Sequence, residues 1–99
     1  HTSSANELAL TGRIDGTTVS VVIDRTFVDE EGIRWIVDYK SSSHEGADLD
    51  GFLTSEQQRY RPQLERYAAL MRHLGPEPIR LGLYFPLLSA WRSWPPPAR

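Results

Sequence analysis

The feature that most constrains the fold is a pair of β-rich segments separated by a short acidic turn. Residues 17–28 are rich in Val, Ile and Thr, which are favoured in strands. Residues 29–32 carry Asp at the first position and Gly at the last, the pattern of a type I turn whose acidic side chains we expect to be solvated. Residues 33–41 are again strand-like, with side chains alternating between two faces. The sequence therefore predicts an antiparallel hairpin at the centre of a sheet.

The remaining segments predict an α/β domain with the element order βββαβ. The segments with strand-like composition and length are residues 6–14, 17–28, 33–41 and 79–85. Asp15-Gly16 is a strong signal for a two-residue hairpin turn between the first two strands. A polar loop over residues 41–51 precedes a predicted helix that begins with a capping box at residues 54–57 and ends at Leu74. Residues 87–94 are expected to form an irregular extension of the last strand.

The whole chain has the length and composition of one small domain. Its 99 residues are too few for two ordinary hydrophobic cores, and its apolar runs are too short to span a membrane. The net charge of −2 argues against nucleic-acid binding through overall positive charge. The absence of cysteine excludes a disulfide scaffold and a thiolate zinc site, and it favours a cytoplasmic location. We interpret residues 1–99 as a single domain and expect it to be part of a longer polypeptide.

Two aspartates on neighbouring strands form the strongest candidate site. If the hairpin turn is centred on residues 30–31, the numbers of opposed residues sum to about 61 or 62, which places Asp24 opposite Val37 or Asp38. Like charges in such a position are destabilising unless one carboxyl is protonated or a cation lies between them. Lys40 follows Asp38 by two residues and therefore points to the same face of the sheet.

These residue types have the chemistry needed for metal-assisted hydrolysis of a phosphodiester. Carboxylate oxygens suit Mg²⁺ or Mn²⁺, which would lower the pKa of a bound water and offset the charge of the phosphate. Lys40, the single lysine in a chain with ten arginines, would position or deprotonate the attacking water, or stabilise the developing negative charge. Spacing alone leaves open the alternative of a solvated salt bridge without a function.

Three short motifs occur in a fixed order along the chain. Asp24-Arg25 is predicted on one strand, Asp38-Tyr39-Lys40-Ser41 on the next, and a Gln-x-x-x-Tyr pattern from Gln63 to Tyr67 on the following helix. In this combination the chain resembles the PD-(D/E)XK nuclease superfamily, and within it the C-terminal nuclease domain of RecB-like helicase–nucleases. The resemblance covers residues 12–94 and implies a restriction-endonuclease-like fold, in which a helix packs on a mixed four-stranded sheet.

The resemblance assigns a role to each residue of the acidic cluster. It implies that Asp24, Asp38 and Lys40 are catalytic, with the two aspartates and the backbone carbonyl of Tyr39 as metal ligands. The family's helix before the first strand, which often brings a further acidic residue or His to the metal, has no counterpart in these residues. We therefore expect this chain alone to bind metal weakly and to cleave poorly.

The resemblance also implies a substrate and partners. Gln63 and Tyr67 would hold the active-site end of the helix and contact the DNA strand. The implied activity is Mg²⁺- or Mn²⁺-dependent hydrolysis of DNA in double-strand break repair and recombination, within a helicase–nuclease. ATP-binding motor domains of the same protein would feed a single-stranded DNA end to the site, and no membrane is involved. The alternative is a non-catalytic module that positions DNA or acts as a scaffold while keeping the nuclease fold.

Overall fold

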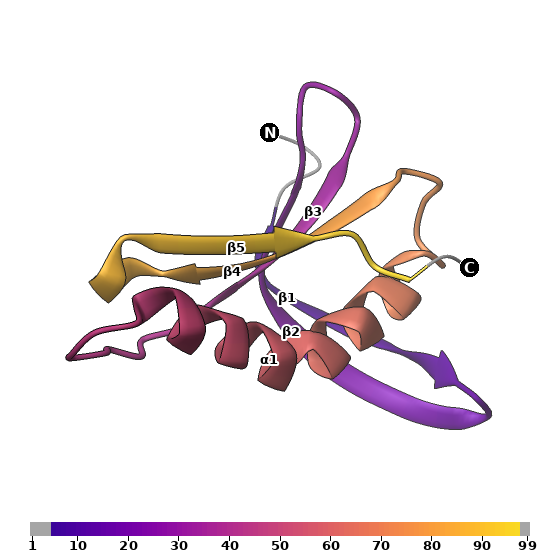
Figure 1. Ribbon diagram of the computed structural model, residues 1–99. Helices are drawn as coiled ribbons and strands as arrows, with labels where there is room; N and C mark the ends of the chain where they lie inside the picture. The colour runs from indigo at the N-terminus through magenta and orange to yellow at the C-terminus, as the bar shows by residue number, and fades with distance from the viewer. Residues whose placement is uncertain (1–4, 98–99) are drawn as a thin grey trace.

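A computed structural model of the chain describes residues 5–97 and shows a sheet with a helix lying across one face (Figure 1). The elements are β1 (Ala5–Ile14), β2 (Thr17–Val28), β3 (Arg34–Tyr39), α1 (Leu49–Met71), β4 (Ile79–Phe85), the 3₁₀ helix η1 (Pro86–Leu88) and β5 (Ala90–Trp94). The predicted α/β class and restriction-endonuclease-like architecture are confirmed. The predicted number of four strands is wrong, because residues 90–94 form a fifth strand rather than an irregular extension. Their backbone groups pair with β4, a contact that residues 87–94 do not reveal by themselves.

The sheet has the strand order β1-β2-β3-β4-β5. Neighbouring strands are antiparallel except for β3 and β4, which are parallel and are connected through α1. A parallel pair needs a crossover of a dozen or more residues, and α1 supplies it. Asp15 and Gly16 have φ angles of 50° and 79°, so they form the predicted tight turn between β1 and β2.

The helix differs from its prediction at both ends. It begins at Leu49 because Asp48 caps it, accepting a hydrogen bond of 3.0 Å from the backbone N–H of Gly51. The capping box predicted at residues 54–57 therefore lies inside α1. The helix ends at Met71, before the predicted Leu74, where backbone bonds spanning three residues replace the helical pattern. Within residues 5–97, no helix combines the length and apolarity needed to cross a membrane.

The two faces of the sheet are covered differently. On one face the apolar stripe of α1 packs against the sheet, as the helical spacing predicts. The buried hydrophobic residues of this core include Ile23, Ile36, Leu64, Ala68, Met71, Leu81, Leu83 and Phe85. The other face carries a row of aromatic rings in mutual contact, formed by Phe27, Trp35, Tyr39, Tyr84 and Trp91. The face toward α1 therefore holds the core, and it also receives the side chains of Asp38 and Lys40.

Candidate active site

The two aspartates of the predicted site lie side by side at one end of the β2–β3 ladder. The last pair of the ladder joins Arg25 to Val37, so Asp24 is in line with Asp38. Of the two registers that the sequence left open, this is the one that opposes the two acids. Instead of continuing the ladder, Asp24 accepts a hydrogen bond of 2.9 Å from the backbone N–H of Tyr39 through Oδ2.

Lys40 completes the cluster from the residue just beyond β3. Its Nζ lies 2.7 Å from Oδ2 of Asp38, and its side chain is largely buried. The backbone N–H of Lys40 donates to the carbonyl oxygen of Tyr84 over 2.8 Å, which continues the pairing between β3 and β4. The parallel neighbour strand therefore holds the backbone from which Asp38 and Lys40 extend.

The environment of Asp38 shifts the pKa of its carboxyl. Burial, and then the neighbouring Asp24 carboxyl, raise the pKa of Asp38 to about 6, although Lys40 acts in the opposite direction. Oδ2 of Asp38 is buried, and within residues 5–97 no group donates a hydrogen bond to it. Its close contact is the ion pair with the Lys40 ammonium, 2.7 Å away. The two expected forms of compensation, protonation and a nearby cation, are both available to this carboxyl.

The donor set fits a divalent ion held by few protein ligands. Asp24 and Asp38 offer carboxylate oxygens, and the Oδ2 atom of Asp38 lacks a hydrogen-bond donor. In the part of the chain that the structure describes, no group of three or more His, Cys, Asp or Glu residues is arranged to hold a metal. The rest of a coordination shell would come from a backbone carbonyl, such as that of Tyr39, from water and from substrate oxygens. Mg²⁺ is usually bound in this way, by one or two carboxylates together with waters and phosphate.

Asp24 can be approached from solvent on the β1 side. Asn6, Glu7, Asp24, Arg25 and Tyr39 line an open hollow there. The ladder between β1 and β2 omits the pair that would join Glu7 to Asp24, and Glu7 has a φ of 53°. This interruption leaves the Asp24 side of the cluster open to a ligand such as a phosphate group.

Two helix residues that the sequence did not assign to the site lie beside it. The ring centroid of Tyr60 is 3.6 Å from Nζ of Lys40. Glu56, one turn earlier, is buried and accepts a hydrogen bond of 3.4 Å from Oγ of Ser42, in the loop that follows Lys40. Glu56, Tyr60 and Gln63 are separated by four and three residues, so they share one face of α1. Counting back from Gln63 by helical spacing leads to Tyr60 and then to Glu56. This spacing is the sequence signal that would have identified both residues.

The motif residues of α1 bind each other. Nε2 of Gln63 donates a hydrogen bond to Oη of Tyr67. Tyr67 is only 5% exposed and belongs to the core, whereas Gln63 is half-buried. The structure therefore shows Tyr67 in a packing position, and the DNA contact predicted for this pair remains a prediction.

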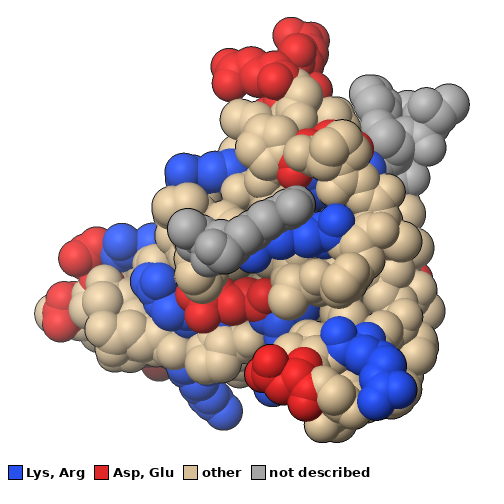
Figure 2. Space-filling model, turned by 90° about the vertical axis from the view of Figure 1, so that its right-hand side faces the viewer, with Lys and Arg blue, Asp and Glu red and all other residues tan. Residues whose placement is uncertain are grey.

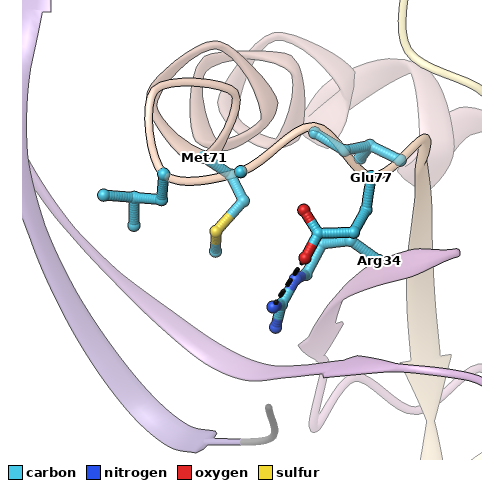
Figure 3. Close-up of a pocket in the computed structure, with 6 residues that line it drawn as sticks. Arg34, Met71 and Glu77 are labelled. Atoms are coloured by element: carbon cyan, nitrogen blue, oxygen red, sulfur yellow. Dashed lines mark ion pairs between the residues drawn. The ribbon is translucent and has the colours of Figure 1, made fainter. Parts of the chain in front are cut away.

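A small cavity at the opposite end of β3 is separate from the acid pair. Figure 3 shows Arg34 and Glu77 pointing toward each other beside Met71, which lies at the end of α1. The two charged groups form an ion pair of 3.6 Å that links the start of β3 to the segment before β4. We assign this cavity a structural role, since its charged groups compensate each other.

The charges on one face of the molecule are dispersed. Figure 2 shows acidic and basic side chains in small separate groups over the face in view, without a broad area of either sign.

A model of the PD-(D/E)XK nuclease superfamily matches residues 2–90, a segment that contains the acid pair, Lys40 and the motif residues of α1. A search of curated proteins finds no match for the chain. The family match does not distinguish branches of the superfamily, so the RecB-like assignment remains a prediction. Nucleases of this superfamily typically use divalent metal ions, in agreement with the donor set described above. Because the match covers most of the chain and the fold agrees with it, the chain belongs to the PD-(D/E)XK nuclease superfamily.

Proposed function

We propose that this chain is the nuclease module of a helicase–nuclease and that it hydrolyses DNA phosphodiester bonds with Mg²⁺ or Mn²⁺. The observation that carries the proposal is the Asp38 carboxyl, which is buried, aligned with Asp24 and in contact with the Lys40 ammonium. A buried carboxyl beside a second carboxyl is costly for stability, and groups with a shifted pKa, such as Asp38, are concentrated at functional sites. The superfamily match supplies the reaction class.

Each residue of the cluster has a distinct part in this proposal. Asp24, Asp38 and the carbonyl of Tyr39 would hold the metal, which when bound lowers the pKa of water and offsets phosphate charge. Lys40 lies between a carboxylate and an aromatic ring face, both of which attract a cation. We therefore assign Lys40 to stabilising the negative charge that develops on the phosphate, rather than to removing a proton from water.

The charge distribution supports a substrate delivered by other domains. The chain is acidic overall, so phosphate contacts on its own surface supply little affinity for DNA. Motor domains that separate the strands of a broken duplex would bring a single-stranded end to the open hollow beside Asp24. The process served would be double-strand break repair and recombination in the cytoplasm.

The second candidate is a non-catalytic module that positions DNA. It is favoured by the small donor set, since the described residues contain two adjacent aspartates but no cluster of three ligands. A module of this kind would bind DNA without cleaving it.

The test combines cleavage with metal binding. The chain is incubated with end-labelled single-stranded and duplex DNA in Mg²⁺, Mn²⁺ or EDTA, beside Asp38→Asn and the control Glu31→Gln, an exposed acid of the β2–β3 turn. We expect slow, metal-dependent cleavage by the parent and the control, with single-stranded DNA preferred, and none by Asp38→Asn. Thermal unfolding should show stabilisation by Mg²⁺ in the parent and the control only.

Three other outcomes would contradict parts of the proposal. Stabilisation by metal without any cleavage would favour the DNA-positioning module. Cleavage in EDTA would exclude the metal mechanism. Cleavage by Asp38→Asn at the parental rate would remove Asp38 from the reaction.

A further inference from the structure

The Lys40 ammonium is held between two groups from different elements. Its Nζ lies 2.7 Å from Oδ2 of Asp38 on β3 and 3.6 Å from the ring centroid of Tyr60 on α1. The Lys40 side chain is 16% exposed, so most of its contact with water is lost. An ammonium is a compact charge on a flexible four-carbon stem, and its position depends on what surrounds it.

Tyr60 is well placed to define that position. It lies one helical turn after the buried Glu56, and its half-buried ring packs against the core beneath α1. Arg59 approaches the same ring, but its guanidinium carbon is 5.2 Å from the centroid and its side chain is largely exposed. The face of an aromatic ring attracts a cation more strongly where water is excluded. Lys40 is therefore the cation that gains most from the ring.

We propose that Tyr60 is a positioning residue, whose ring face holds the Lys40 ammonium beside Asp38. The contact is made by the ring face and does not involve the hydroxyl group. Removing the ring frees the ammonium to adopt other rotamers around its long stem, so that it spends less time at the acid pair. The consequence for catalysis rests on the proposed nuclease function, whereas the holding of Lys40 does not.

Variants that keep or remove the aromatic ring at position 60 distinguish a positioning role from simple packing. Tyr60→Phe keeps the ring and removes the hydroxyl. Tyr60→Leu and Tyr60→Met keep an apolar side chain and remove the ring, and the second of these serves if the first does not fold. Trp91→Leu is the matched control, because it removes an exposed aromatic ring from the opposite face of the sheet.

The first experiment observes Lys40 directly and needs no activity. Lys40 is the single lysine in the chain, so labelling with ¹³C-lysine yields one side-chain spin system in an NMR spectrum. We expect the ε-methylene protons to be shifted upfield by the Tyr60 ring in the parent, Tyr60→Phe and Trp91→Leu. In folded Tyr60→Leu or Tyr60→Met the resonance should return toward its position in an unfolded peptide. An unchanged resonance in these variants would overturn the proposal.

The second experiment measures the rate. Under saturating Mg²⁺, Tyr60→Leu should lower kcat for single-stranded DNA about tenfold, which corresponds to about 1.4 kcal/mol, with KM unchanged. Tyr60→Phe should restore the parental rate, and Trp91→Leu should not alter it. An equal loss in Tyr60→Phe would show that the hydroxyl acts, and a parental rate in Tyr60→Leu would show that the contact is not used. If the parent itself does not cleave, the proposed function fails, while the NMR result still decides whether Tyr60 holds Lys40.

Discussion

An aspartate stands at each end of the β2–β3 hairpin, and the two have opposite surroundings. Asp29, in the turn, accepts hydrogen bonds from the backbone N–H groups of Glu31 and Ile33 and from Nε1 of Trp35, at 2.9, 3.0 and 2.9 Å. The Trp35 donor, followed by the backbone donors, holds the pKa of Asp29 below its ordinary value. Asp38 is buried beside a second carboxyl, and its pKa is raised to about 6.

The difference shows that surroundings, rather than residue type, distinguish the two acids. Hydrogen-bond donors stabilise the charged form of Asp29, whereas burial and a second carboxyl destabilise that of Asp38. The prediction that the acids of the turn are only solvated is incomplete for Asp29, because its two oxygens also bind three N–H groups of its own hairpin. The charged form of Asp29 is stabilised by the fold. The charged form of Asp38 is destabilised by it, and a bound metal ion would relieve that cost.

The largest expected contrast is in activity. Asp38→Asn should reduce the rate of DNA cleavage by about a thousandfold or more, because it removes a metal ligand from the reaction. Asp29→Ala should retain the parental rate, since Asp29 lies at the far end of the hairpin from the acid pair. Initial rates on one single-stranded substrate in Mg²⁺ test both. Equal losses in the two variants would mean that the rate reports only the integrity of the hairpin.

The second contrast is in stability, and it has opposite signs. In EDTA at pH 8, Asp38→Asn should raise the free energy of unfolding by about 1 to 3 kcal/mol, because it removes a charge that folding buries. Asp29→Ala should lower the free energy of unfolding, because the Trp35 and backbone donors lose their acceptor. Urea denaturation of both variants provides the comparison. A stability loss in Asp38→Asn would indicate that the ion pair with Lys40 outweighs the burial cost.

The pH dependence should also differ between the two acids. Between about pH 4 and pH 6 the unfolded chain loses the Asp38 proton, from its ordinary pKa of 3.8, while the folded chain keeps it. The metal-free protein should therefore lose stability as the pH rises through this range, and Asp38→Asn should not. Asp29 has a lowered pKa, so its contribution is present above pH 3.8 and is lost as the pH falls further. Denaturation curves in EDTA from pH 3 to pH 8 measure how the free energy of unfolding changes with pH. A constant free energy in either range would contradict the corresponding prediction.

The smallest effect is expected from Trp35→Phe. This change keeps an aromatic ring facing Phe27 and removes the Nε1–H group that donates to Asp29. We expect a small decrease in melting temperature. Below pH 3.8 the free energy of unfolding should change with pH more as it does in Asp29→Ala. Cleavage should be unchanged. A loss of cleavage in this variant would show that the turn affects the acid pair, and would contradict the view that the two ends of the hairpin act independently.

Much of the acid pair was predictable because it depends on local rules. Side chains alternate along a strand, so Asp38 and Lys40 had to share a face. The turn at residues 29–32 limited the hairpin to two registers, and one of them opposes Asp24 to Asp38. The motif order then indicated the superfamily that the family model confirms.

The helix boundaries were less predictable. The capping box at residues 54–57 predicted a later helix start, whereas Asp48, a residue type that also caps helices, provides the observed one. Propensity alone does not choose between them. The fold selects Asp48, which places Glu56 inside α1, with its buried carboxyl toward the loop that follows Lys40. The strand at residues 90–94 was missed for a related reason, since it depends on pairing with β4.

The sequence by itself thus determined the hairpin, limited it to two registers and indicated the superfamily to which the chain belongs, whereas the structure selected the register that opposes the two aspartates. Only the tertiary structure decided how each carboxyl is solvated and which ring meets the Lys40 ammonium. Burial of Asp38 depends on α1 covering that end of the sheet, and the contact of Tyr60 depends on the rotation of α1 about its axis. Both are set by packing between residues distant in the chain, which local periodicity does not encode.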